Sequence, residues 1–235
     1  MIERTYEAQL YAPLFYSSSE GRSIRTQPTL SATALMHALG YRYFGLEKRY
    51  AQFGTDATSP DYSYLSDLSF FVTDMRPIAV ELNERTFRST DYRSERHFTT
   101  NEKDLAAEIN GKKSAPPILE TSGAAWQTVR NYIGISPGST FEFTIWSDDS
   151  DSLPDNPFFR MGIKQTGEFR ATERALDTIL LNKFLLSEVY ELSEQTLTEL
   201  MENSSSFRRG NDPRLQHFVD VDCDFVRNSV ISEVI

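Results

Sequence analysis

The chain has 235 residues, of which 39% are hydrophobic, and its formal net charge is −10. This length suits one compact domain, or one domain with a long insertion, and it allows a sizeable core. Cys223 is the only cysteine and no apolar run approaches the roughly 18 to 20 residues of a membrane helix, so the composition excludes an intramolecular disulfide, a cysteine metal site and a membrane span. The start of the chain lacks the pattern of a secretory signal, so we expect a cytoplasmic protein.

The N-terminal part of the chain predicts a strand followed by a helix. Residues 5–16 have apolar residues at every second position, which is the spacing of a strand with one buried face. Residues 27–41 have small and apolar residues at helical spacing. Thr29 or Ser31 can cap this helix, and Gly40 is its expected end.

The middle of the chain predicts two strands and then an irregular segment. Strands are expected at residues 68–75 and 77–83, and Arg76–Pro77 breaks the pattern between them. Residues 83–100 show neither helical nor strand spacing. We therefore expect residues 83–117 to form an insertion within the domain.

Four elements are expected between the insertion and the C-terminal part. Residues 126–135 and 140–146 alternate between apolar and polar and are joined by a Ser-Pro-Gly-Ser turn, which predicts a hairpin. Residues 158–165 predict a strand, and residues 167–174 predict a turn into the next element.

The C-terminal part completes an α+β pattern. Residues 175–203 are apolar at first and helical toward their end, and residues 215–226 alternate as a last strand. Adjacent strands without a helix between them indicate antiparallel pairing, so the predicted fold class is α+β. A ferredoxin-like βαββαβ core with long insertions fits this order of elements, in a single domain of residues 1–235.

The sequence lacks the motifs of nucleotide and metal enzymes. It has no phosphate-binding glycine loop, no His-Glu-x-x-His pair and no Gly-x-Ser-x-Gly nucleophile motif. The three histidines, His37, His97 and His217, do not have the spacing of metal ligands. We therefore expect no cofactor, no metal and no catalytic residue.

His37 is the one residue for which a catalytic role can be argued. It lies on the predicted first helix, and a histidine can take the proton from a 2′-hydroxyl in metal-free RNA cleavage. The alternative is a histidine that packs or hydrogen-bonds beside the apolar stripe of that helix, and the sequence favours this alternative.

Residues 83–100 combine basic and aromatic residues in an acidic chain. The residues of these types that we select as RNA-binding are Arg85, Phe87, Arg88, Tyr92, Arg93, Arg96 and His97. Guanidinium groups bind phosphate bidentately and stack on bases, and aromatic rings stack on unpaired bases, so single-stranded RNA binding uses both. The alternative is a solvated loop whose arginines pair with neighbouring acids.

Two further basic segments have residue types suited to a phosphate. Around the strand expected at 158–165, cations flank a glycine that lets a backbone approach a phosphate; these residues are Arg160, Gly162, Lys164 and Arg170. Arg22 and Arg25 precede the first helix, whose N-terminal amides attract anions. The alternatives are an ordinary glycine turn and a capped turn.

The choice of arginine over lysine is pronounced. The chain has 18 arginines and six lysines against 34 acidic residues. Acidic, lysine-poor surfaces suit molar salt, where the screening length falls to about 3 Å, so we expect a salt-adapted source. Counterion release weakens as salt rises, so RNA affinity there must come from stacking and direct hydrogen bonds, which arginine provides.

Three stretches together resemble a known family: residues 6–22 (YEAQLYAPLFYSSSEGR), 29–45 (TLSATALMHALGYRYFG) and 158–171 (FFRMGIKQTGEFRA). They are similar to the small subunit of type I-D CRISPR surveillance complexes (Cascade) that caps the 5′ handle of the guide RNA. That subunit belongs to the RAMP superfamily, which is built on RRM-like ferredoxin folds. The resemblance follows the order of elements over most of the chain and rests on a strand, a small-residue helix and an Arg-x-Gly-x-Lys strand.

The resemblance implies a non-catalytic subunit in antiviral defence. It would hold the guide RNA handle, contact the large subunit and the first backbone subunit, and border the target DNA near its PAM end. By position, Arg160, Gly162 and Lys164 would fall on the strand that faces the handle, and residues 83–100 would grip RNA or a neighbouring subunit. The acidic total departs from the basic character expected of such subunits, which implies that RNA binding depends on assembly.

Two other functions stay open at this point. One is a metal-independent RAMP endoribonuclease that matures the guide RNA, with His37 as the general base. The other is a protein–protein scaffold that makes no contact with nucleic acid.

Overall fold

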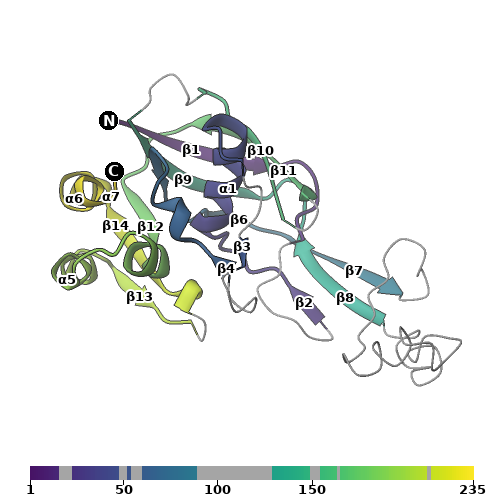
Figure 1. The fold of residues 1–235 in the computed structure, drawn as a ribbon. Coiled ribbons are helices and arrows are strands. Elements are labelled where there is room, and N and C mark those ends of the chain that lie inside the picture. The colour runs from purple at the N-terminus through teal and green to yellow at the C-terminus, as the bar shows by residue number, and fades with distance from the viewer. Residues whose placement is uncertain are drawn as a thin grey trace, which may run out of the picture.

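The structure is a computed structural model, and it describes residues 1–15, 23–47, 52–53, 60–88, 129–148, 154–162, 165–210 and 213–235. For residues 23–25, 52–53, 60, 85–88 and 129–132 the description is limited to the backbone. Figure 1 shows a central sheet covered by one helix, a C-terminal layer of strands and helices, and an arm that extends away from the C-terminal layer.

The central sheet confirms the predicted α+β, ferredoxin-like core. Its strands, in sheet order, are β10 (Phe158–Met161), β11 (Gly167–Glu173), β1 (Ile2–Leu10), β9 (Thr140–Ser147) and β5 (Phe70–Val72), and β6 (Arg76–Ala79) also pairs with β9. Every pairing in this sheet is antiparallel. Helix α1 (Ala32–Tyr43) connects β1 to β5, and β9 lies between these two strands, which is the split β-α-β arrangement of ferredoxin-like folds.

The predicted alternation of β1 determines which face of the sheet is buried. Tyr6, Ala8 and Leu10 are at most 1% exposed, whereas Gln9 is exposed. Helix α1 covers this buried face, because the ideal Cβ position of Gly40 lies only 3.4 Å from the Phe70 ring. The opposite face of the sheet is open beside β10, β11 and β1.

The predicted start of α1 is confirmed, and its predicted end is wrong. The Ser31 hydroxyl accepts a hydrogen bond from the Thr33 amide at 3.3 Å, so Ser31 is the N-cap. The helix continues past Gly40 to Tyr43. A Cβ on Gly40 would lie 3.1 Å from the Leu46 side chain, so this glycine permits close packing inside the helix and does not end it.

Two predictions about turns are wrong, the turn at residues 167–174 and the hairpin of residues 126–146. In both cases the segment pairs with strands that are distant in the sequence. Residues 167–173 form strand β11, in which Phe169 and Ala171 are buried against the core. Strands β8 (Val129–Ile135) and β9 lie in different sheets and do not pair as a hairpin. The connection between them bonds to β1 instead, because the Gly138 amide donates to the Leu10 carbonyl oxygen at 2.7 Å.

The break predicted at Arg76–Pro77 lies a few residues earlier. Strand β5 ends at Val72, and β6 begins at Arg76 and contains Pro77. The chain leaves the sheet between them, where the Asp74 amide donates to the Leu180 carbonyl oxygen at 3.1 Å. Pro77 is tolerated because β6 pairs with β9 alone in the described part of the chain.

The arm is a three-stranded ribbon of β2 (Ser23–Arg25), β8 and β7 (Leu82–Arg88) in that order. β7 and β8 are antiparallel, and β2 joins β8 in parallel. The prediction that residues 83–88 lack strand structure is therefore wrong. The insertion at 83–117 stays a prediction, because residues 89–128 lie outside the described ranges.

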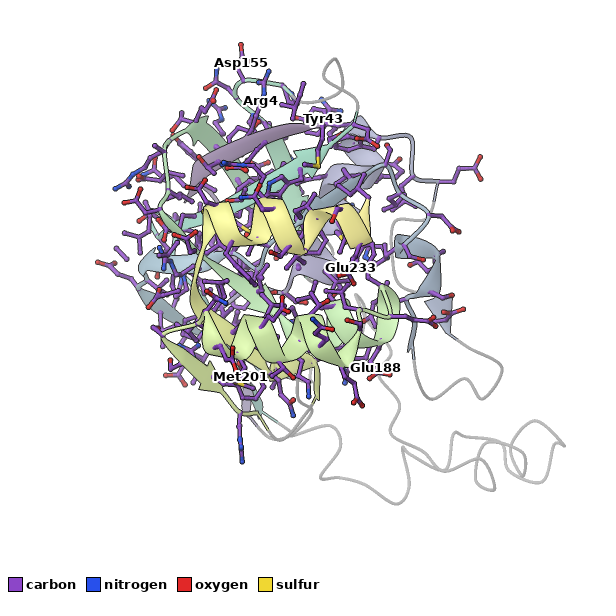
Figure 2. All side chains as sticks on the ribbon, turned by 90° about the vertical axis from the view of Figure 1, so that its left-hand side faces the viewer. Arg4, Tyr43, Asp155, Glu188, Met201 and Glu233 are labelled. Atoms are coloured by element: carbon purple, nitrogen blue, oxygen red, sulfur yellow. The ribbon has the colours of Figure 1, made fainter. Side chains whose placement is uncertain are left out.

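The C-terminal layer is a second sheet with three helices. Its strands are β12 (Thr178–Asn182), β14 (His217–Asp222) and β13 (Ser206–Arg208), and its helices are α5 (Glu194–Glu202), α6 (Cys223–Ser229) and α7 (Ile231–Val234). Figure 2 looks onto this side, where α5 and α6–α7 lie next to one another. The Thr196 hydroxyl on α5 donates to the Glu233 carboxylate on α7 at 2.8 Å.

Short elements complete the chain: β3 (Gln52–Phe53), β4 (Pro60–Asp61), η1 (Ser63–Leu65), the π-helical turn η3 (Leu185–Val189) and η4 (Pro213–Leu215). The helix expected toward the end of residues 175–203 is α5. It comes after β11, the last strand of the central sheet along the chain. The strand expected at 215–226 ends at Asp222, whose carboxylate caps α6 by accepting from the Phe225 amide at 2.9 Å. None of the described helices has the length and apolar character needed to cross a bilayer.

A buried carboxylate joins the central sheet to the C-terminal layer. Asp74 is fully buried, and its Oδ1 accepts from the Ala32 amide at the start of α1 at 2.6 Å. Its Oδ2 lies 2.7 Å from His217 Nδ1 on β14, and Asn182 of β12 donates to Oδ1 at 3.5 Å. The positive end of α1 and two donors from the other layer thus stabilise one carboxylate.

We predict that Asp74→Ala lowers the free energy of unfolding by about 3 to 5 kcal/mol, because it leaves buried donors of two layers without an acceptor. Chemical denaturation measures this loss. The matched control is Asp155→Ala, which removes an exposed partner of Arg4 and costs at most about 1 kcal/mol. Equal losses in the two variants would contradict the role given to Asp74.

Candidate nucleic-acid interface

Three glycines surround Leu14 where the arm meets the central sheet. A Cβ on Gly162 would lie 2.5 Å from Leu14 Cδ1, one on Gly167 would lie 2.6 Å from the same atom, and one on Gly134 would lie 2.6 Å from the Leu14 carbonyl oxygen. Leu14 is fully buried, and its backbone exchanges hydrogen bonds of 3.0 and 2.8 Å with Ile135 at the end of β8. Leu14 therefore fixes the root of the arm against the turn between β10 and β11.

This packing accounts for Gly162 without a ligand. Its φ is +86°, a conformation that favours glycine, and its open side faces Leu14 and the carbonyl oxygen of Phe15. From the sequence, the missing side chain of Gly162 was expected to make room for a phosphate. The RNA contact of Gly162 stays a prediction.

The register of the arm brings arginines and aromatic residues onto one face. Arg85 on β7 is paired with Tyr132 on β8, and Phe87 is paired with Arg130. Paired residues share a face of an antiparallel ribbon, and positions two apart share it as well, so these four residues occupy one face. Arg85 and Phe87 were predicted from the sequence as RNA-binding residues, whereas Arg130 and Tyr132 were not, because they lie outside the basic segment 83–100.

The other arm residues that we selected lie on the opposite face. Arg88 is paired with Val129, and Glu84 with Ile133. Arg25 on β2 is the parallel partner of Ile133, which places it on that same face. The arm thus has one face with two arginines and two aromatic residues, and one face of mixed character.

The open face of the central sheet carries a groove of about 680 Å³. Its floor is a row of residues in register across four strands, Phe158 on β10, Arg170 on β11, Gln9 on β1 and Thr140 on β9. Tyr11, just beyond the end of β1, also lines it. Its ring is 52% exposed, and the Arg170 guanidinium lies 5.1 Å from the ring centroid.

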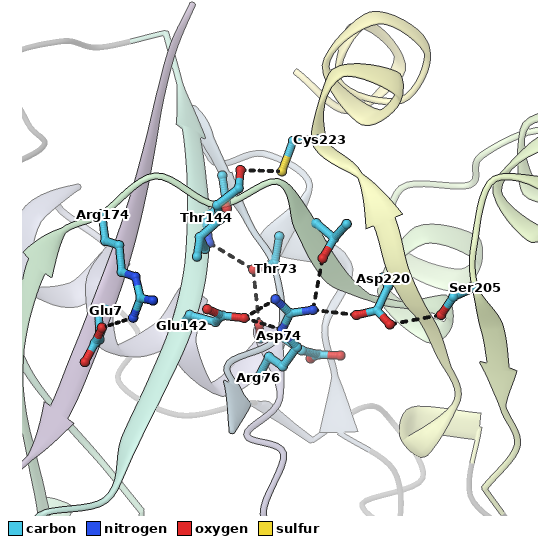
Figure 3. Close-up of polar contacts among 12 residues, drawn as sticks. Glu7, Thr73, Asp74, Arg76, Glu142, Thr144, Arg174, Ser205, Asp220 and Cys223 are labelled. Carbon is cyan, nitrogen blue, oxygen red and sulfur yellow. Dashed lines mark hydrogen bonds and ion pairs between the residues drawn. The ribbon is translucent and has the colours of Figure 1, made fainter. Parts of the chain in front are cut away.

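The glutamates of this face are each paired with an arginine. Glu168 pairs with Arg160 and Glu7 with Arg174, in contacts that join neighbouring strands. Figure 3 shows the Glu7–Arg174 pair. The RNA contact predicted for Arg160 stays a prediction, because its guanidinium is paired with Glu168.

Glu142, another glutamate of this face, belongs to a bridge between the two sheets. Arg76 donates to Glu142 and also to the Asp220 carboxylate on β14, which in turn accepts from the Ser205 hydroxyl at 3.0 Å (Figure 3). Asp220 has a φ of +51° at an irregularity in β14, and this backbone turns its carboxylate toward Arg76.

Arg170 differs from the other arginines of this face. Among the residues that the structure describes, no carboxylate pairs with Arg170, and its guanidinium lies over the ring of Tyr11. The guanidinium is therefore available to an anion in the groove.

His37 has the geometry of a packed residue. It is 6% exposed, and burial lowers the pKa of its imidazole. Its Nδ1 donates to the Thr33 carbonyl oxygen at 2.6 Å, so Nε2 is the acceptor for the Tyr64 hydroxyl. Both nitrogens are used inside the fold, which favours the packing role over a general base.

The remaining predicted site residues lie outside the described ranges: Arg22, Tyr92, Arg93, Arg96, His97 and Lys164. Cys223 is 5% exposed, and burial raises the pKa of its thiol to about 11, as expected of a small packed residue. Within the described ranges, no three His, Cys, Asp or Glu side chains are grouped as metal ligands.

Comparisons with known proteins add one strong similarity. The family model described as "Type I-D CRISPR-associated protein Cas5/Csc1" matches residues 1–209. A comparison with curated protein sequences found no match.

Two solved chains that match this one distantly come from cryo-EM structures of the type III-B Cmr-beta complex bound to cognate target RNA, one of them also with AMPPnP. The chain from the AMPPnP structure has 11% identity and a TM-score of 0.38, and the other has 13% and 0.34. Each comparison covers 97% of this chain and 90% of the other. Similarities this distant do not inform the function.

We predict that Gly162→Ala lowers the free energy of unfolding by about 1 to 3 kcal/mol more than Gly138→Ala does. Both glycines have positive φ, at +86° and +90°, so both variants carry the same backbone strain. Only the Cβ at Gly162 meets Leu14, whereas the one at Gly138 has no atom within 4 Å. Equal losses in denaturant titrations would contradict the packing role of Gly162.

Proposed function

The chain belongs to the type I-D CRISPR-associated Cas5/Csc1 family, and from this we propose that it is a non-catalytic, RNA-binding subunit of the CRISPR effector complex. In this proposal it holds the 5′ handle of the guide RNA and contacts the large subunit and the first backbone subunit, beside the PAM end of the target DNA. The arm is the main contact surface for the RNA.

The observation that carries this proposal is the register of β7 and β8. Pairing of Arg85 with Tyr132 and of Phe87 with Arg130 puts two arginines and two aromatic residues at positions on one face of a short ribbon. Guanidinium groups bind phosphates, and aromatic rings stack on unpaired bases. A solvated loop whose arginines pair with adjacent acids would not need this pattern.

The position of the arm reconciles RNA binding with an acidic chain. Residues 191–235 carry nine acids and four bases, and they form most of the C-terminal layer. Figure 1 shows this layer on one side of the central sheet and the arm on the other. At moderate salt, charges are screened over about 8 to 10 Å, so the acidic residues of the C-terminal layer contribute little to the electrostatic potential at the arm. The net charge of −10 therefore does not predict the local charge of the arm.

The proposal extends along the chain from the described part of the arm. Tyr92, Arg93, Arg96 and His97 follow β7 directly in sequence, and Arg22 precedes β2. We assign them to the same RNA contact because they continue its residue types. The imidazole of His37 is buried and uses both nitrogens in hydrogen bonds, which supports a non-catalytic subunit over an endoribonuclease.

We predict that Arg85→Glu with Arg130→Glu reduces the guide RNA retained by the purified complex by about 10- to 100-fold, because two charge-assisted phosphate contacts become repulsive. The measurement is the RNA content of complexes co-expressed with neighbouring genes. The control is Arg42→Glu, which reverses an exposed arginine near the end of α1. Full assembly with unchanged RNA would favour a protein–protein scaffold.

We predict that His37→Ala leaves guide RNA maturation unchanged and lowers stability by about 1 to 3 kcal/mol, because it removes the acceptor of the Tyr64 hydroxyl. Denaturing gels of a handle-containing precursor RNA test the first part, and thermal unfolding tests the second. Cleavage by the wild-type chain that disappears in the variant would establish the endoribonuclease instead.

A further inference from the structure

We infer that the groove on the open face of the central sheet is a second RNA site, which holds one unpaired nucleotide next to the root of the arm. This inference rests on the proposed function, because it places the same RNA strand on a second surface. The groove residues that carry it are Gln9, Tyr11, Thr140, Asn156, Phe158 and Arg170.

The groove and the arm share a structural root. Tyr11 closely precedes Leu14, whose backbone pairs with Ile135 at the end of β8. At the other end of the floor, Thr140 follows Ser139, whose hydroxyl accepts from the Glu81 amide just before β7 at 3.1 Å. An RNA strand that leaves the arm at its root therefore meets the groove next.

Each part of a nucleotide has a matching group in the groove. The rings of Tyr11 and Phe158 offer faces for a base. The side-chain amides of Gln9 and Asn156 offer donors and acceptors for its edge. The Arg170 guanidinium can bind a phosphate, and its place over the Tyr11 ring puts the cation beside the stacking surface.

The electrostatics of the face favour an anion at this row. Glu7 also lines the groove and is bound by Arg174, and Glu168, on the same face, is bound by Arg160. The row itself contains no acidic residue and one arginine, Arg170. A phosphate placed there meets the Arg170 guanidinium, which no carboxylate of the described residues pairs with, and glutamates that arginines already bind.

The backbone of the floor argues against an extended peptide as the occupant. Three of the four floor strands, β11, β1 and β9, are paired on both sides within the sheet, so a peptide strand could be added only at the rim, along the outer edge of β10. Over the floor itself, recognition comes from side chains. Their mixture of rings, amides and one guanidinium fits a nucleotide.

The test is a ribonuclease footprint of the guide RNA in the purified complex. We expect Tyr11→Ala and Arg170→Ala each to raise the cleavage rate at one nucleotide, adjacent to the stretch that the arm protects, by roughly 5- to 100-fold. Tyr11→Phe keeps the ring and should keep the protection. Ultraviolet cross-linking followed by mass spectrometry should place a nucleotide on the peptide that contains Tyr11 or Phe158.

The controls come from α1, where Tyr41→Ala and Arg42→Ala alter an exposed tyrosine and an exposed arginine away from the groove. They should leave the footprint unchanged. Circular dichroism of each variant checks that the fold is retained.

The remaining outcomes separate the two proposals. A footprint that changes in the Arg85→Glu, Arg130→Glu variant but not in the groove variants overturns this inference and leaves the proposed function standing. Groove variants that lose a protein subunit while the footprint stays the same show a protein interface and also overturn it. A wild-type complex that retains no RNA overturns both this inference and the proposed function.

Discussion

The close packing of Leu14 against Gly134, Gly162 and Gly167 is the constraint on which the functional surfaces depend. The glycines come from the arm and from the hairpin of β10 and β11, and any larger residue at these positions would meet Leu14 atoms at 2.6 Å or less. Because Leu14 also pairs with Ile135, a short segment after β1 aligns the arm with the open face of the central sheet. Both proposed RNA surfaces thus meet at one buried side chain.

The charge distribution shows why a net value says little about binding. On the open face, Glu7 is bound by Arg174 and Glu168 by Arg160, whereas no carboxylate of the described residues pairs with Arg170. Arginine suits this arrangement because its planar fork can pair with a carboxylate or stack on a ring while it keeps its charge. The acidic residues of the C-terminal layer lie on the other side of the molecule from the arm.

The C-terminal layer stabilises the core and leaves the open face of the sheet accessible. Asp74 joins it to the start of α1, and Arg76 bridges Glu142 and Asp220 across the two sheets. These contacts lie at the β5 and β9 side of the central sheet. The opposite side, with β10, β11 and β1, keeps its outer face free for the groove.

The sequence by itself determined the elements that bury one face. The alternation of Tyr6, Ala8 and Leu10 predicted β1, and the spacing of residues 27–41 predicted α1, because side-chain periodicity is a local property of the chain. It also predicted the α+β class.

Only the tertiary structure decided which strands pair and in which register. A turn sequence between β8 and β9 predicts a hairpin, yet Leu14 takes the place beside Ile135 and the two strands enter different sheets. The same long-range pairing brings Arg130 onto the face of Arg85. In the described part of the chain it gives Arg160 a carboxylate partner and gives Arg170 none. The register of a strand depends on its contacts with distant segments, and these contacts cannot be predicted from the spacing of apolar residues within the strand.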